Sequence, residues 1–183
     1  MSHPSGAKSY KETITHYREL RTAVYEFSEN EFSAFGAKFS EISYQDAIEA
    51  DKWRWGDESK APIWEWSRLY HAYRSNSGVK RFDVAIRAHG KLCGLCYGVP
   101  SRQKLMLKLH ALSRLPNANP LAGNILSMVL FSADAYARLI GAQELWLCNP
   151  MNRHLVALYE SVGFESHRNG VGVTTHLSMR IGS

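Results

Sequence analysis

The first third of the chain carries apolar residues at helical spacing. From Glu12 onward they recur every three or four positions, at Ile14, Tyr17, Leu20, Val24 and Phe27. This spacing places them on one face of a helix. Ser43 followed by Asp46 is a capping pattern that predicts a second helix, ending at Trp53. A third helix is predicted over residues 62–74, because it opens with a proline and continues with apolar residues.

The pattern changes after Gly78 from helical spacing to short apolar runs. Residues 81–88, 92–99 and 104–112 form three such runs, separated by turn residues, and the third alternates apolar with polar positions. Short, alternating runs bounded by turns are typical of strands. They predict an antiparallel three-stranded meander.

Helices and strands alternate in the last third. A broad apolar helical face follows the loop at residues 115–120, with Asn119 as its predicted N-cap, Pro120 as its first residue and Gly141 as its end. The remaining predicted elements are a strand at 144–148, a helix ending at Gly163, and strands at 164–167 and 173–180. A strand–helix–strand order favours a parallel pair within a mixed sheet. We expect one domain, with a helical portion at 1–78 and a sheet core at 79–183.

Two polar residues bracket an apolar stripe in the helix before Gly163. Asn152 and Tyr159 are seven residues apart, which is two helical turns, so both project to the same side. Such a pair can offer two polar groups to a ligand. The alternative is an asparagine cap and a tyrosine that only fills the core.

This segment resembles the signature of the GNAT acyltransferase superfamily, in which an asparagine precedes a helix that ends in Leu-Tyr-Glu-x-x-Gly-Phe. The matching residues are Asn152, Leu158, Tyr159, Glu160, Gly163 and Phe164. The resemblance covers about residues 80–181 and implies the GNAT α/β fold, a central mixed sheet with helices on both faces. It also implies an N-acetyltransferase that moves acetyl from acetyl-CoA to a primary amine by direct attack in a ternary complex, without a metal.

The same resemblance assigns roles to Asn152 and Tyr159. It implies that the Asn152 side chain contacts the pantetheine arm and that the Tyr159 hydroxyl protonates the departing thiolate. A V-shaped split is expected between the strand ending near Leu112 and the strand at 144–148. There the backbone of Ala111, Leu112 and Ser113 is predicted to orient and polarise the thioester.

The pyrophosphate loop of that family, Gln/Arg-x-x-Gly-x-Gly/Ala, is only partly matched here. Residues 118–123 occupy its place, with Gly123 at the last position, Leu121 instead of the first glycine and Ala118 instead of Gln/Arg. A helix N-terminus can bind phosphate through unpaired backbone N–H groups. Asn119, Gly123 and Asn124 are therefore candidate cofactor-binding residues, and a simple helix cap is the alternative for Asn119.

A base for the acceptor amine is expected on the strand before this loop, and the resemblance places it near Leu109 and His110. No acid occurs there, but a histidine has an ordinary pKa of about 6.5 and can accept a proton directly or through water. His110 is the candidate base. The alternative is a strand histidine without catalytic use.

Composition narrows the class of protein. The chain has 183 residues, 45% of them apolar, which suits one globular domain. It contains neither a run of about 20 apolar residues nor a secretion signal, so a soluble, cytoplasmic protein without membrane contact is expected. The net charge of +5 and the pI of about 9.2 fit an anionic partner such as coenzyme A or a nucleic acid.

Two alternative functions follow from these features. The net positive charge is compatible with a GNAT enzyme that acts on aminoacyl-tRNA or another RNA-borne substrate. The altered phosphate loop motivates a non-catalytic binding module with the GNAT fold. A homodimer is compatible with the resemblance.

The cysteines and tryptophans are interpreted as mainly structural. Cys93 and Cys96 form a lone CxxC without further ligands at zinc spacing, and on a strand they are expected to point to opposite faces. Cys148 has no evident histidine partner and is not expected to be a nucleophile. Trp64 and Trp66 belong either to the core or to an acceptor-side wall.

Overall fold

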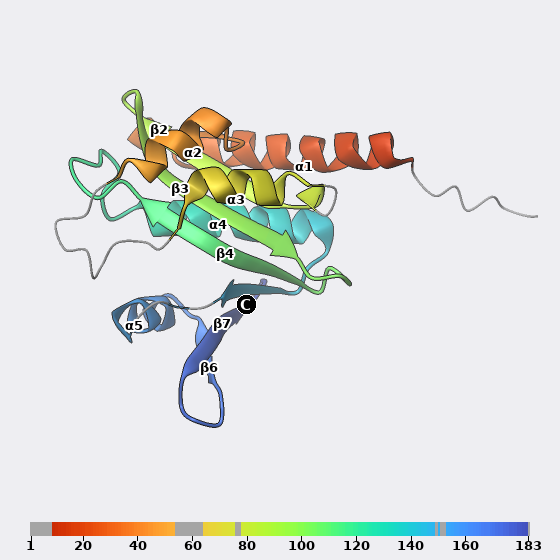
Figure 1. Ribbon diagram of the computed structural model, residues 1–183, viewed down its shortest axis with the longest axis vertical. Coiled ribbons are helices and arrows are strands. Elements are labelled where there is room, and N and C mark those ends of the chain that lie inside the picture. The colour runs from red at the N-terminus through yellow and green to blue at the C-terminus, as the bar shows by residue number, and fades with distance from the viewer. Residues whose placement is uncertain (1–8, 54–63, 76–77, 149, 151–152, 183) are drawn as a thin grey trace, which may run out of the picture.

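The computed structural model describes residues 9–53, 64–75, 78–148, 150 and 153–182, and Figure 1 shows its ribbon. The elements in chain order are α1 (Tyr10–Glu31), η1 (Ser33–Phe35), β1 (Lys38–Ser40), α2 (Tyr44–Asp51), α3 (Trp66–Tyr73), β2 (Phe82–Ala88), β3 (Lys91–Pro100), β4 (Met106–Arg114), α4 (Ile125–Ile140), β5 (Glu144–Cys148), α5 (Arg153–Ser161), β6 (Glu165–Arg168) and β7 (Thr174–Arg180). No helix in the described ranges is long and apolar enough to cross a bilayer.

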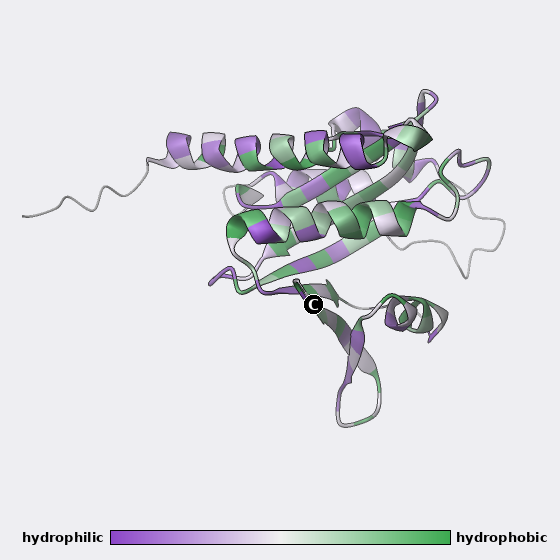
Figure 2. Ribbon diagram, turned by 180° about the vertical axis from the view of Figure 1, so that it is seen from behind, coloured by the Kyte–Doolittle hydropathy of each residue, from purple (hydrophilic) through white to green (hydrophobic). Residues whose placement is uncertain are grey.

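Seven strands form one mixed sheet in the order β1-β2-β3-β4-β5-β7-β6. β4 and β5 pair in parallel, and all other neighbours pair antiparallel. Helices α2 and α3 cover one face of the sheet, and α1 and α4 cover the other, as the front and rear views show (Figures 1 and 2). The predicted α/β architecture with helices on both faces is confirmed.

Local sequence signals explain several helix ends. Ser9 and Glu12 form a capping box at the start of α1, and Ser43 and Asp46 form the predicted one at the start of α2. Gly141, with a φ of 76°, ends α4 as predicted. Phe27 is 54% exposed instead of buried, and it stacks on the Phe131 ring of α4 at 5.1 Å between centroids.

Two helices begin later than predicted. α3 starts at Trp66, and its first backbone N–H groups donate to the Asp51 carboxylate of α2; Pro62 lies outside the described residues. α4 starts at Ile125 instead of Pro120, after a turn in which the Ala122 N–H donates to the Asn119 carbonyl at 3.1 Å. In both cases a contact from outside the helix, or a turn before it, decides where helical hydrogen bonding begins.

A β-bulge overturns the prediction for the two neighbouring cysteines. Leu92 pairs with Arg87 and Gly94 pairs with the adjacent Ile86, so Cys93 is an extra residue on β3. The bulge shifts the alternation of side chains along the strand. Cys93 and Cys96 therefore point to the same face and are both buried in the core under α1 and α4. Burial raises the pKa of both thiols, which fits a structural role.

The N-terminal portion also supplies a strand that was not predicted. β1 is three residues long, with only its central residue Phe39 buried, and it pairs with β2. Alternation over three residues is too short to be recognised in a sequence. This edge strand joins the helical portion to the sheet.

A group of buried charges links α1, β2 and the segment after β1. The Asp83 carboxylate has no exposed surface and lies 3.1 Å from Nε of Arg81 and 3.6 Å from Nε of Arg21. The backbone N–H of Ile42 donates to Asp83 at 2.9 Å. Glu41 completes the group by pairing with Arg21 and Arg81. Each buried charge therefore has an opposite charge beside it, as burial requires.

Candidate active site

The sheet opens between its two parallel strands. Met106–Leu109 of β4 pairs with Glu144–Leu147 of β5, and β4 then continues to Arg114. Beyond Leu109, the edge of β4 that faced β5 has no strand partner in the described ladder. This is the V-shaped split that the sequence predicted between these strands, and it leaves backbone hydrogen-bonding groups open to a ligand.

His110 sits at a bulge at the start of the open segment. Ala111 pairs with Tyr97 and Leu109 pairs with the adjacent Gly98, so His110 is the extra residue on β4. Leu109 packs in the core under α1 and α4, whereas Ala111 packs under α2 and α3. The bulge thus reverses which residues of β4 face each layer, beginning at the point where the split opens.

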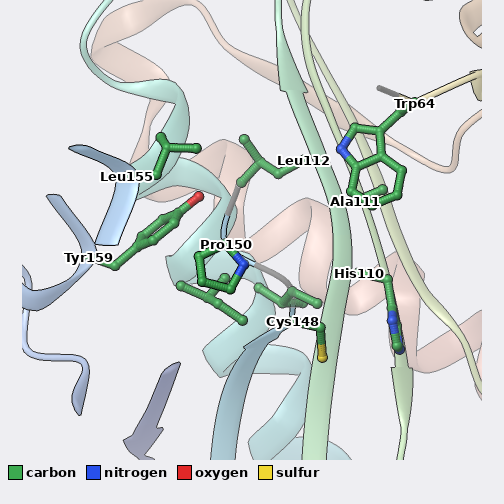
Figure 3. Close-up of a pocket in the computed structure, with 10 residues that line it drawn as sticks. Trp64, His110, Ala111, Leu112, Cys148, Pro150, Leu155 and Tyr159 are labelled. Carbon is green, nitrogen blue, oxygen red and sulfur yellow. The ribbon is translucent and has the colours of Figure 1, made fainter. Parts of the chain in front are cut away.

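A cavity of about 60 Å³ lies at this split (Figure 3). It is lined by Trp64, Leu109, His110, Ala111, Leu112, Leu147, Cys148, Pro150, Leu155 and Tyr159. Four residues proposed from the sequence are therefore brought together in one place: His110, Ala111, Leu112 and Tyr159.

Tyr159 enters the cavity from α5. Its side chain is 8% exposed, and burial, with a smaller contribution from Cys96, raises the pKa of its hydroxyl to about 12. Figure 3 shows the hydroxyl directed toward the space between Leu155 and Leu112. The phenol is un-ionised at neutral pH and has a proton to donate.

His110 presents a neutral imidazole to the same site. Burial, followed by the charge of Lys108, lowers its pKa below the ordinary value. Its Nε2 atom is buried without a hydrogen-bond partner among the described residues. In Figure 3, His110 and Tyr159 lie on opposite sides of the β4 ribbon. A proton acceptor and a proton donor thus flank the open strand.

The loop before α4 does not have the helix cap that was one interpretation of Asn119. Its side-chain amide donates to the carbonyls of Cys93 at 2.9 Å and Leu115 at 3.2 Å and accepts from the Leu121 N–H at 2.9 Å. Asn119 is not the N-cap of α4, and its hydrogen-bonding groups are used to fix the loop to β3. The expectation of a helix cap at Asn119 is therefore wrong, because the helix begins five residues later.

The N-terminus of α4 nevertheless remains suited to an anion. Leu121 is 1% exposed and points into the core, so the residue that replaces the family's glycine does not obstruct the loop. Gly123 has a φ of 84°, with no atom within 4 Å of the position of a Cβ. Asn124 is the N-cap, and no described side chain caps the first turn. Unpaired N–H groups at such a terminus attract phosphate.

Other site residues were missed or lie outside the description. Asn152 falls outside the described residues, as does the side chain of His154. Trp64, which the sequence assigned either to the core or to an acceptor-side wall, lines the cavity. Leu155 and Cys148 were not among the candidate site residues: Leu155 could have been found from its spacing of four from Tyr159, whereas Cys148 comes from β5. Burial raises the pKa of the Cys148 thiol, which leaves it protonated. No group of three or more His, Cys, Asp or Glu side chains in the described part converges as metal ligands.

The chain was compared with known families, proteins and solved structures, and only the solved structures gave matches. No family model matches the sequence, and no curated protein matches it. Among solved structures, a GNAT superfamily phosphinothricin acetyltransferase from Sinorhizobium meliloti in complex with AcCoA has a TM-score of 0.61 at 13% identity, over 80% of this chain and 89% of that one. The PaiA N-acetyltransferase from Thermoplasma acidophilum in complex with coenzyme A has a TM-score of 0.55 at 14% identity, over 79% and 98%.

A third solved structure, the ribosomal-protein-S18-alanine N-acetyltransferase from Escherichia coli, has a TM-score of 0.54 at 16% identity, over 80% of this chain and 95% of that one. These likenesses confirm the GNAT fold that the sequence motif predicted.

Proposed function

We propose that this protein is an N-acetyltransferase that transfers acetyl from acetyl-CoA to a primary amine by direct attack within a ternary complex. The observation that carries the proposal is the cavity at the split between β4 and β5, flanked by the Tyr159 phenol and the His110 imidazole. The GNAT fold supports it, since the solved structures named above include complexes with AcCoA and coenzyme A.

The residues present fit coenzyme A at two places. The first turn of α4, with Gly123 and Asn124, would hold the pyrophosphate through backbone N–H groups. The open edge of β4 at Ala111–Ser113 would bind the pantetheine arm by backbone hydrogen bonds, with Asn152 as a further contact. Bound acetyl-CoA supplies an activated thioester.

A group of this chain is available for each step of the transfer. His110 takes a proton from the attacking amine, directly or through water. Backbone N–H groups of the open β4 segment stabilise the charge that develops on the carbonyl oxygen. Tyr159 gives its proton to the sulfur as the bond to carbon breaks. Because His110 and Tyr159 lie on opposite sides of β4, proton removal and proton donation are separated in space.

Thermal-shift titration with acetyl-CoA tests the proposal directly. Acetyl-CoA and desulfo-CoA should raise the unfolding temperature saturably, and ATP should not. A ligand at one hundred times its Kd stabilises the folded state by about 2.7 kcal/mol. No shift up to millimolar ligand, repeated by calorimetry, would contradict the proposal and favour a non-catalytic binding module.

The pH dependence of turnover is expected to identify His110 as the base. Because burial lowers its pKa below 6.5, the proton-accepting form is present at neutral pH and is lost only as the pH falls through that lowered value. His110→Gln should lower turnover about a hundredfold and remove the inflection below pH 6.5. The control His89→Asn, in the exposed β2–β3 turn, should keep the wild-type profile. An unchanged profile in His110→Gln would exclude His110 as the base.

A further inference from the structure

The open segment of β4 is anchored by a side chain of α3. The Ser113 hydroxyl accepts a hydrogen bond from Nε1 of Trp66 at 3.0 Å. Both residues are buried, with exposed fractions of 3% and 1%. Ser113 directly follows Leu112, which lines the cavity. This bond therefore holds β4 on the side of the sheet opposite α4, just past the split.

A series of stacked rings extends the contact back to the bulge. Trp66 stacks on Tyr97 at 5.7 Å between centroids, and Tyr97 stacks on Tyr73 at 4.7 Å with an interplanar angle of 11°. The Tyr73 ring lies 6.3 Å from the His110 ring. Trp66 and Tyr73 are seven residues apart on α3, so they share one helix face. That face contacts β4 at both ends of residues 110–113.

Helix α3 is itself fixed at both ends. At its start, the Asp51 carboxylate accepts hydrogen bonds from the backbone N–H groups of Trp66 and Ser67, at 2.6 and 3.2 Å. At its end, the Arg74 guanidinium donates to the Ile42 carbonyl and lies 4.4 Å above the Tyr70 ring. A helix held in this way can serve as a rigid support for the strand beneath it.

The open segment needs such a support. A strand inside a sheet is fixed by ladders on both edges, but residues 111–113 are paired only with β3 in the described ladder, and His110 is the extra residue of the bulge. Donors that stabilise developing charge work only when they are held in place before the reaction. The supporting residues of a site set this precision.

We propose that Trp66 is a positioning residue of the acetyl-CoA site, which holds the open β4 segment through its hydrogen bond to Ser113. The inference rests on the proposed function, because it assumes that this segment binds the thioester. The segment that leads into α3 also contributes to the site, since Trp64, two residues before Trp66, forms part of the cavity wall. Trp64, just before α3, thus contributes to the cavity, and Trp66, the first residue of α3, supports the strand beside it.

The variants Trp66→Phe and Ser113→Ala each remove the hydrogen bond while leaving most of the packing. Each should weaken acetyl-CoA binding about tenfold by calorimetry, the change that corresponds to the net contribution of about one hydrogen bond. The double variant should bind like either single variant, because both remove the same interaction. The matched control is Ser132→Ala, which removes a buried 2.8 Å hydroxyl pair with Ser28 between α1 and α4; its Kd should equal that of the wild type.

Hydrogen–deuterium exchange of the free protein provides a second readout. Amides of residues 110–113 should exchange faster in Trp66→Phe and Ser113→Ala than in the wild type, and Ser132→Ala should leave them unchanged. If both variants keep the wild-type Kd for acetyl-CoA and the wild-type exchange rate of these amides, the inference is overturned. If the wild type itself fails to bind acetyl-CoA, the proposed function fails, and the exchange result alone decides whether Trp66 holds the segment.

Discussion

Tyr159→Phe is expected to lower turnover about a hundredfold or more while leaving acetyl-CoA affinity nearly unchanged. The substitution removes only the hydroxyl. The ring keeps its buried place in the core and its edge-to-face contact with Phe164, whose centroid is 6.2 Å away. The loss would therefore fall on the step in which sulfur leaves, because a thiolate without a proton donor is a poorer leaving group.

Two measurements separate this effect from damage to the fold. Turnover is followed by release of free thiol with a panel of amine acceptors, and the Kd of acetyl-CoA is measured by calorimetry. Tyr136→Phe is the matched control, because it removes another buried tyrosine hydroxyl. Tyr136 lies on α4, and its hydroxyl donates to the Lys80 carbonyl at 2.8 Å. Equal turnover in Tyr159→Phe and the wild type would remove Tyr159 from the mechanism.

The largest loss of stability is expected from Asp83→Ala. This change leaves Arg81 and Arg21 without their buried carboxylate and removes the acceptor of the Ile42 N–H. Breaking a buried ion pair by removing one partner costs about 3–5 kcal/mol, because the remaining charge stays buried. Urea denaturation should show this decrease in the free energy of unfolding.

An exposed ion pair provides the comparison for Asp83. Lys38, whose side chain is 73% exposed, lies 3.1 Å from Glu29. Lys38→Met should change the free energy of unfolding by less than about 1 kcal/mol, since solvent screens such pairs. A similar small change in Asp83→Ala would show that the buried group contributes no more than a surface pair.

The sequence by itself determined the features that depend on residues close together along the chain. The capping box of Ser43 and Asp46, the end of α4 at Gly141 and the β2–β3–β4 meander were all predicted from such local patterns. The mixed sheet followed from the order of these elements. For the site, spacing and the family motif together indicated Tyr159 and His110, which the structure brings to one cavity.

Only the tertiary structure decided the features that need a partner far along the chain. Asn119 was interpreted as a helix cap or a phosphate contact, but its side-chain amide donates to the carbonyl of Cys93, 26 residues away. Trp66 meets Ser113 across 47 residues, and the bulges at Cys93 and His110 appear only when β3 and β4 are paired with their neighbours. Periodicity reports which face of an element is apolar. It contains no information on which distant group that face will contact. These long-range contacts set the register of the strands, the start of α3 and the walls of the cavity.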